Sequence, residues 1–429
     1  MSSSKRRVVI VGGVRTPFVR AFGPFAEMDT IALGCAAVRG LLDRTGVERK
    51  RVESIVWGGV LLPGMSPNVG REIALDLKMA HAEAVTVTRA CASGLQAVTT
   101  AAAAIERGDA DVVIAGGSDS TSNAEVKLPQ KLIRAAAPLA FGKATLGDVV
   151  GMAAKLAPLG ELVPRMPKIA ERTTGQVMGE AAEEMARRNE IGRGLQDTFA
   201  VRSHQRAAAA IASGRFDGEV IAVQTPDGAW VHTDQIVRGD TSVEKLAKLK
   251  PAFAKDGSVT AASSSPLTDG AAAVLIVAEE VAKSLGLVPL AAVSSWAYAA
   301  VDPADQLLMG PALAIPKLLD RAGMALGDVD LVDLHEAFAS QVLSIVKMLG
   351  SEAFARMRLG RDAAVGEIAA DKLNIHGGSI AIGHPFAATG ARMVTTMANE
   401  LHRSGKRTAL LGLCAAGGLG AAALLERVD

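Results

Sequence analysis

The chain has 429 residues, more than the ~250–300 at which a single hydrophobic core stops growing, so two or more domains are expected. Its formal net charge is +1 at pH 7, which favours neither nucleic acid nor an anionic membrane surface as a partner. Three cysteines cannot all pair, and none has metal-ligand spacing, so we expect a reducing, cytoplasmic compartment and no metal site.

The two ends of the chain contain no predicted targeting or membrane segment. The N-terminus passes from a short polar stretch directly into a predicted strand at 8–11, without the apolar region of a secretory signal. The longest uncharged run, 409–425, is shorter than a membrane-spanning helix and contains four glycines. We therefore predict strand, turn and strand for this run, inside a core.

The two halves of the chain repeat each other. Three pairs of similar segments occur in the same order: 41–46 with 318–323, 52–56 with 329–333, and 92–100 with 388–396. Each copy predicts a helix that ends at a glycine, a buried strand, a long helix and a fully apolar strand. The long helices are expected at 93–107 and 388–402, and the apolar strands after them at 112–115 and 409–413. This pattern predicts two copies of one α/β unit rather than a short-period solenoid.

Alternation of apolar strands with helices predicts the α/β fold class, with a mostly parallel sheet covered on both faces. We expect an N-terminal unit at 1–126, completed by 244–286, and a C-terminal unit at 287–429. Between them, 127–243 reads as a helical loop domain.

The first part of this helical region is basic. Eight cations (Lys127, Lys131, Arg134, Lys143, Lys155, Arg165, Lys168, Arg172) face three acids (Asp148, Glu161, Glu171). The segment is either a solvated helical cap or a basic wall for a phosphate-bearing substrate.

Cys91 follows a predicted strand at 85–88 and opens the helix 93–107. Unpaired N–H groups at a helix start favour a thiolate, and the small residues after Cys91 would let a substrate carbonyl approach the sulfur. The alternative is a buried structural cysteine, which is the expectation for Cys35 in the middle of another helix.

His384 lies between glycines, in a predicted strand-to-helix turn, and is the candidate base for such a nucleophile. In the repeat, Cys91 falls opposite Ala387, three residues after His384, so related loops of the two units would bring both side chains face to face. The alternative is a histidine that caps the following helix.

Two further residues stand at predicted strand ends. His335 directly follows the strand 329–334, where parallel α/β sheets place function, and is either a donor to an oxyanion or a satisfied core histidine. Cys414 ends the other apolar strand and enters a glycine-rich turn. A second thiol could act as acid and base at a carbon centre; the absence of a C-x-x-C pair argues against redox partners.

With these motifs in place, the chain resembles the thiolases, enzymes that make or cleave 3-ketoacyl-CoA thioesters. The resemblance runs nearly end to end, from 11–18 to the Cys414 turn. The segments 335–339, 342–373 and 377–386 resemble the β-subunit branch of the fatty-acid-oxidation trifunctional complexes. It implies a duplicated, five-layered α-β-α-β-α fold and reversible transfer between 3-ketoacyl-CoA and CoA.

The resemblance also implies residue roles. Cys91 would be acylated, His384 would take its proton, and Cys414 would exchange a proton with C2 of acetyl-CoA. His335 and His384 would donate hydrogen bonds to the thioester oxygen. The backbone N–H groups of Cys91 and Ala416 would donate to the oxygen of the acyl-enzyme. Coenzyme A, a substrate rather than a bound cofactor, would lie near Met178, Gly179 and Ser265.

Three positions depart from the common thiolase pattern: Thr88 replaces an asparagine, Val177 a histidine, and Ala416 a glycine. Alanine at 416 would be strained if its φ were positive. The resemblance further implies a homodimer or tetramer and a possible hydratase/dehydrogenase α-subunit. A decarboxylating ketoacyl synthase and an inactive CoA- or lipid-binding relative remain alternatives, although Cys414 has no task in a decarboxylating condensation.

Overall fold

This computed structural model describes residues 6–126, 129–140, 142, 145, 147 and 170–428. The chain divides into a small unit, 124–169, and a main unit that contains all other residues. The small unit includes helix α4 (Gln130–Ala140). Much of the predicted basic segment lies outside the described residues, namely Lys127, Lys143, Lys155, Arg165, Lys168, Asp148 and Glu161. The basic-wall hypothesis therefore stays a prediction.

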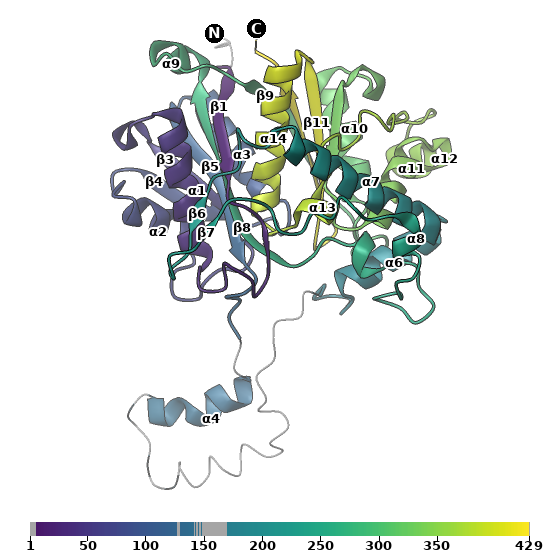
Figure 1. Cartoon of the computed structure of the whole chain (residues 1–429), viewed down its shortest axis with the longest axis horizontal. Coiled ribbons are helices and arrows are strands. Elements are labelled where there is room, and N and C mark those ends of the chain that lie inside the picture. Colours follow the sequence, from purple (N-terminus) through teal and green to yellow (C-terminus); the bar gives the residue numbers. More distant parts are fainter. Residues whose placement is uncertain are drawn as a thin grey trace. The chain divides into compact units, whose positions relative to one another are not determined.

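The main unit is built on a connected sheet of ten strands among the described residues (Figure 1). Their order is β10-β11-β12-β9-β1-β8-β5-β3-β4, and β2 pairs with β8. The strands are β1 (Val8–Arg15), β2 (Val19–Arg20), β3 (Ser54–Gly58), β4 (Glu83–Val87), β5 (Val112–Ser120), β8 (Thr268–Ala278), β9 (Ala291–Ala300), β10 (Leu331–Leu334), β11 (Thr408–Ala415) and β12 (Leu419–Glu426). A separate two-stranded sheet joins β6 (Val223–Gln224) and β7 (Trp230–Val231).

Most strands of each half of the sheet run in one direction, as predicted. Strands β4, β3 and β5 are parallel neighbours, and β8 is antiparallel to both β5 and β1, so β1 runs the same way as β5. In the second half β10 and β11 are parallel, and β12 is reversed between β11 and β9. A short antiparallel pairing of β1 with β9 joins the two halves.

The predicted repeat appears in the structure as equivalent elements. Helices α1 (Thr30–Thr45) and α10 (Gly310–Ala322) end at left-handed glycines, Gly46 with φ 69° and Gly323 with φ 64°. These positions favour glycine because a Cβ is strained at positive φ. The long helices α3 (Ser93–Arg107) and α14 (Ala388–Ser404) end in the same way at Gly108 and Gly405. The prediction of two copies of one α/β unit is therefore confirmed.

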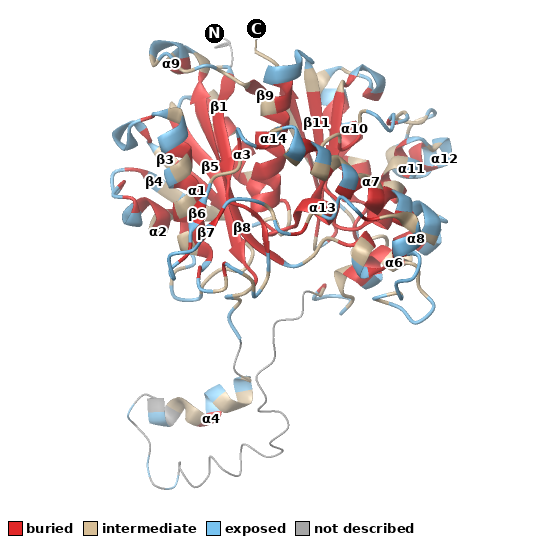
Figure 2. Cartoon of the chain, viewed as in Figure 1, coloured by how far each residue is buried: buried red, intermediate tan, exposed pale blue. Residues whose placement is uncertain are grey.

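Helices and sheet halves alternate in five layers. Helices α1 and α2 (Val69–Asp76) cover the outer face of the first half, and α10 covers that of the second. Helices α3 and α14 pack on each other and on strands of both halves, so they form the central layer. Figure 2 shows this central layer and the strands beside it as mostly buried. The fold class predicted from the sequence is confirmed.

The remaining helices lie mostly beyond the second half of the sheet. They are α6 (Met178–Arg188), α7 (Arg193–Ala212), α8 (Val243–Leu246), α9 (Glu279–Ser284), α11 (Ala339–Leu349), α12 (Glu352–Phe354) and α13 (Ser379–Ile382). In the described part of the chain, none of the helices has the length and apolar character needed to cross a membrane. The uncharged run 409–425 forms β11, a turn and β12, as predicted.

Candidate active site

Cys91 lies in the turn between β4 and α3. The Ser93 hydroxyl holds this turn, because it donates to the Ala90 carbonyl at 2.6 Å and accepts from the Arg89 N–H at 2.8 Å. Ala90 has a φ of 45°, in the left-handed region that is costly for a residue with a Cβ. The chain thus turns sharply before the helix and presents a partly buried cysteine at its start.

His384 lies between the short helix α13 and the long helix α14. The sequence predicted a strand before His384, and this part of the prediction is wrong. Its backbone N–H donates to the Thr268 hydroxyl at 2.8 Å, and its ring Nδ1 shares a 2.6 Å hydrogen bond with the Thr389 hydroxyl. The other ring nitrogen, Nε2, is buried without a partner among the described residues. The alternative of a helix cap finds no support, since α14 has no side-chain cap.

His335 follows β10, as predicted, and its N–H donates to the Gly412 carbonyl of the neighbouring strand at 2.8 Å. Its Nδ1 lies 3.1 Å from the Ser379 hydroxyl, and its Nε2 is buried without a partner in the described structure. The ring centroids of His335 and His384 are 4.2 Å apart. Two buried imidazoles therefore stand together, each with one unsatisfied nitrogen, a costly arrangement unless a ligand completes it.

The Cys414 turn meets Cys91 through its backbone. The Ala416 N–H lies near the Cys91 sulfur and favours its charged form. Positive φ values in this turn belong to Gly417 (81°) and Gly418 (70°) and not to Ala416, so alanine is not strained there. Glu171 accepts a hydrogen bond from the Gly417 N–H at 3.0 Å and thereby anchors the turn.

Glycines bring the two central helices close enough to join these loops. A Cβ on Gly94 would lie 2.2 Å from the Ala387 carbonyl oxygen, and one on Gly390 would lie 2.3 Å from the Leu95 nitrogen. These two glycines are equivalent in the repeat. Asp119, at the end of β5, also holds the His384 loop, because it accepts the Ala387 N–H at 2.8 Å. The predicted approach of the Cys91 and His384 loops is thus built into the packing of α3 on α14.

Replacing Gly94 by alanine should destabilise the protein, because the new Cβ would overlap a backbone carbonyl that cannot move independently. Overpacking of this kind costs about 1–3 kcal/mol or more. Urea unfolding would measure the loss. Gly194, an exposed helical glycine with no atom near its would-be Cβ, provides the control, and Gly194→Ala should be neutral or stabilising. Equal stability of Gly94→Ala and wild type would contradict the close approach.

The resting thiol and imidazole are both uncharged at neutral pH. Burial raises the pKa of Cys91 to about 12, and the nearby Asp119 carboxylate raises it further, while the Ala416 N–H opposes the rise. Burial, with a contribution from Arg392, lowers the pKa of His384 to about 3. The N–H groups at the helix start were expected to favour a thiolate, and desolvation of the buried sulfur acts against them. Burial also raises the pKa of Cys414, and Cys91 adds to this.

The high thiol pKa predicts how Cys91 reacts with iodoacetamide. Because only the thiolate is nucleophilic, the labelling rate should rise about tenfold per pH unit from pH 7 to 9, without a plateau. Peptide mapping by mass spectrometry would follow Cys91 separately from Cys35. A plateau already reached below pH 7 would instead show a stabilised thiolate paired with a protonated His384.

The predicted coenzyme A contacts fall on two segments. Ser265 bonds through its N–H to the Ala337 carbonyl at 2.9 Å, next to His335. Met178 and Gly179 begin α6, where Gly179 lies against Phe253 so closely that a Cβ would come within 2.2 Å of the ring. Val177, a departure from the thiolase pattern, precedes them as the helix N-cap, and Thr88 is exposed after β4. Whether these residues contact coenzyme A stays a prediction.

A basic cavity lies beside the Ser265 segment. It has a volume of about 490 Å³, and its lining includes Ser264 and three cations, Arg20, Arg238 and Lys245. Asp240 also lines it and pairs with Lys245 at 2.8 Å, so the excess positive charge comes from the two arginines. His204 in the same lining accepts the Arg238 N–H at 3.2 Å. Burial lowers the pKa of His204 to about 4, so it is a neutral acceptor. The cations are far in sequence from the basic segment at 127–172.

The sequence analysis did not single out the residues that support the site: Asp119, Glu171 as an anchor, Ser379, Thr389 and Arg392. A signal existed for Asp119, which is an acid at the end of an apolar strand, and for Ser379 and Thr389, which flank His384. Arg392 gave no such signal, because a cation on a long helix usually faces solvent, whereas this one is 1% exposed.

Known proteins with similar sequences match nearly the whole chain. The family described as "Thiolase, N-terminal domain" matches residues 8–280, and "Thiolase, C-terminal domain" matches 287–427. A 3-ketoacyl-CoA thiolase of Alteromonas mediterranea is 46% identical over 98% of this chain and 97% of its own. One from Vibrio cholerae is 45% identical over 99% and 98%.

Solved structures agree with these matches. The acetyl-CoA acetyltransferase of Bacillus anthracis superposes with a TM-score of 0.84 at 32% identity and covers 100% of both chains. Human mitochondrial 3-ketoacyl-CoA thiolase, solved in complex with CoA, gives a TM-score of 0.83 at 29% identity and covers 99% of this chain and 98% of its own.

Proposed function

Because this chain belongs to the thiolase family, we propose that it catalyses reversible acyl transfer, 3-ketoacyl-CoA + CoA ⇌ acyl-CoA + acetyl-CoA, through an acyl-cysteine. The observation that carries the proposal is the approach of the Cys91 and His384 loops where α3 packs on α14, with the Cys414 turn near Cys91. Beside His384 stands His335, and the Nε2 atoms of both rings lack partners in the described structure. Two thiols and a neutral imidazole are the groups that such a reaction requires.

In the first half-reaction, Cys91 attacks C3 of the ketoacyl chain as its proton passes to His384 Nε2. The C2–C3 bond breaks and its electron pair becomes the enolate of acetyl-CoA. Cys414 gives its proton to C2, which releases acetyl-CoA and leaves an acyl group on Cys91. The proton held by His384 then replaces the one that Cys414 lost. A neutral resting His384 suits this role, because a protonated ring could not accept.

Two oxyanions need donors along this path. The enolate oxygen of acetyl-CoA would lie between the Nε2 atoms of His335 and His384, which are buried and have no partner among the described residues. The backbone N–H groups of Cys91 and Ala416 would bind the oxygen that develops on the acyl carbon. In the second half-reaction CoA gives its thiol proton to His384, and the CoA sulfur attacks the acyl carbon. The bond between this carbon and the Cys91 sulfur then breaks, Cys91 takes the proton back from His384, and acyl-CoA is released.

Incubation with acetoacetyl-CoA and CoA tests the proposal. Formation of acetyl-CoA is expected, and assays with 3-ketoacyl-CoA from C4 to C16 would define the preferred chain length. Absence of turnover with all of them would refute the thiolase activity. This result would leave the alternative of an inactive CoA- or lipid-binding relative. A decarboxylating condensation is disfavoured because it gives Cys414 no role.

We propose that the basic cavity binds the phosphate groups of coenzyme A, with Ser264 and Ser265 beside the remainder of the molecule. Replacing Arg238 by alanine should raise KM for CoA several-fold and leave kcat nearly unchanged, because the cation contributes to binding and not to proton transfer. Exposed Arg39 on α1 is a matched control, since it lines a different cavity. An unchanged KM in Arg238→Ala would place the phosphates elsewhere.

We further propose a domain organisation, a compartment and an oligomeric state for this chain. The region 127–243 would form the coenzyme A-binding loop domain between the units 1–126 with 244–286 and 287–429; the position of β8 beside β1 and β5 supports this division. A cytoplasmic homodimer or tetramer, with a possible hydratase/dehydrogenase α-subunit, is proposed from the family resemblance. A monomer mass in light scattering would refute self-association.

A further inference from the structure

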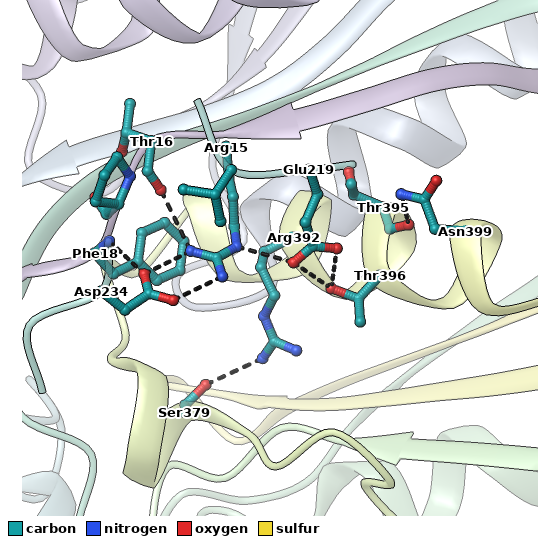
Figure 3. A network of polar contacts seen from close by, with 12 residues as sticks. Arg15, Thr16, Phe18, Glu219, Asp234, Ser379, Arg392, Thr395, Thr396 and Asn399 are labelled. Carbon is teal, nitrogen blue, oxygen red and sulfur yellow. Dashed lines mark hydrogen bonds and ion pairs between the residues drawn. The ribbon is translucent and has the colours of Figure 1, made fainter. Parts of the chain in front are cut away.

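A buried arginine contacts one of the two histidines indirectly, through a serine. Among the described residues, the Ser379 hydroxyl has two hydrogen-bond partners: Arg392 Nη2 at 3.4 Å and His335 Nδ1 at 3.1 Å. All three residues are at most 1% exposed, so no bulk water competes for these contacts. Figure 3 shows Arg392 reaching from α14 toward Ser379.

The chemistry of these partners indicates the direction of each bond. A guanidinium group can only donate, so the Ser379 oxygen accepts from Arg392. The hydroxyl has a single hydrogen, and His335 Nδ1 is the remaining partner that can accept it. Burial, His384 and Arg392 lower the pKa of His335 well below its usual value, so its ring is neutral and carries one proton. We therefore place that proton on Nε2, the nitrogen that has no partner among the described residues.

We propose that Ser379, oriented by Arg392, is a positioning residue that fixes His335 as the Nε2–H tautomer, so that His335 presents a permanent donor to the thioester oxygen. The proposal rests on the function proposed above. The proposal adds to that function a fixed role for His335, which can only donate a hydrogen bond and cannot take over the role of His384 as base.

His384 provides the contrast. Its Nδ1 partner, Thr389, receives no hydrogen bond from a cation among the described residues, so the Thr389 oxygen is free to accept the Nδ1–H of His384. His384 can therefore carry its resting proton on Nδ1, which leaves Nε2 free to accept a proton as base and then to donate it. The two histidines differ because Arg392 contacts only the serine of the first pair.

The surroundings hold the serine and the arginine in place. Arg392 Nη1 lies 3.3 Å from Asp333 on β10. The Glu336 carboxylate accepts the Ile380 N–H at 3.2 Å, directly after Ser379. It also fills the space where a Cβ on Gly378 would lie. The turn is thus fixed from both sides.

Neutron diffraction on deuterium-exchanged crystals of the wild-type protein tests the tautomer without any assay. We expect deuterium on His335 Nε2 and a Ser379 deuteroxyl that points to Nδ1. Deuterium on Nδ1 would overturn the proposal. This measurement is independent of the proposed function, so an inactive wild-type protein would refute the thiolase activity and still allow the tautomer to be decided.

A double-mutant cycle tests the consequence. Ser379→Ala should lower kcat for thiolysis by about 10²-fold, the cost of losing an oxyanion donor, with little change in KM. In a His335→Asn background the same substitution should have almost no effect, because an amide NH₂ donates whatever its neighbour does. Equal losses in both backgrounds would reduce Ser379 to a structural role and overturn the proposal. Ser340→Ala, a buried serine that bonds the Ala182 carbonyl, is the matched control and should keep wild-type kcat.

Discussion

Replacing Cys414 by alanine should stop cleavage of the carbon–carbon bond and leave acyl transfer to Cys91 intact. Cys414 is the group proposed to protonate C2, and its raised pKa keeps it a thiol that holds the required proton at neutral pH. Loss of a general acid costs about 10²–10⁴-fold in rate, so thiolysis of acetoacetyl-CoA should fall by at least this factor. Loss of absorbance of the 3-ketothioester would measure it.

The same variant should still exchange label between free CoA and acetyl-CoA. This exchange forms and reverses the acetyl-enzyme, for which only Cys91 and His384 move protons. A rate of exchange close to wild type, together with loss of thiolysis, would assign Cys414 to the carbon centre. Loss of both reactions in a folded Cys414→Ala protein would contradict the separation of roles.

Cys91→Ala should abolish both reactions, because Cys414, the other thiol of the site, is proposed to act at the carbon centre and not to carry the acyl group. Removal of an enzyme's nucleophile typically costs more than about 10⁴-fold, since the remaining groups act only in concert with it. Mass spectrometry after incubation with acetyl-CoA should show an acetyl adduct on wild type and Cys414→Ala, and none on Cys91→Ala.

Cys35→Ala is the matched control for both variants. Cys35 is a buried thiol on α1 that lies 3.8 Å from Asp76, and its pKa is raised to about 12, as is that of Cys91. A high pKa alone therefore does not identify a nucleophile. Cys35→Ala should keep thiolysis and CoA exchange, and an acetyl adduct that moved to Cys35 would refute the assignment of Cys91.

The sequence allowed the reacting side chains to be proposed, because their settings are local. The glycines that end α3 and α14 allowed the bounds of both helices to be predicted within two residues. The three loops that bear Cys91, His384 and Cys414 could be recognised beside these helices and the strands. The repeat also predicted that two of these loops would meet. Their meeting needs the glycines at 94 and 390, which were part of the repeated pattern itself.

The charge states of the two thiols and of the His384 ring could not be predicted from the sequence. A cysteine at a helix start predicts a thiolate, but the structure surrounds Cys91 with apolar groups and places the Asp119 carboxylate nearby. The turn before His384 was expected to follow a strand, because α13 has four residues, three of them apolar, and is too short to show a helical period.

By itself, the sequence determined the duplicated α/β architecture, the family and the three side chains proposed to react, since helix stops, apolar strands and glycine-rich turns depend on neighbours along the chain. Only the tertiary structure decided what each side chain carries at rest: a thiol on Cys91, a neutral ring on His384, and an Nε2 proton on His335 if the Ser379 proposal holds. Burial and hydrogen bonds set these states, and their partners come from distant segments, as Asp119 does for the Ala387 loop.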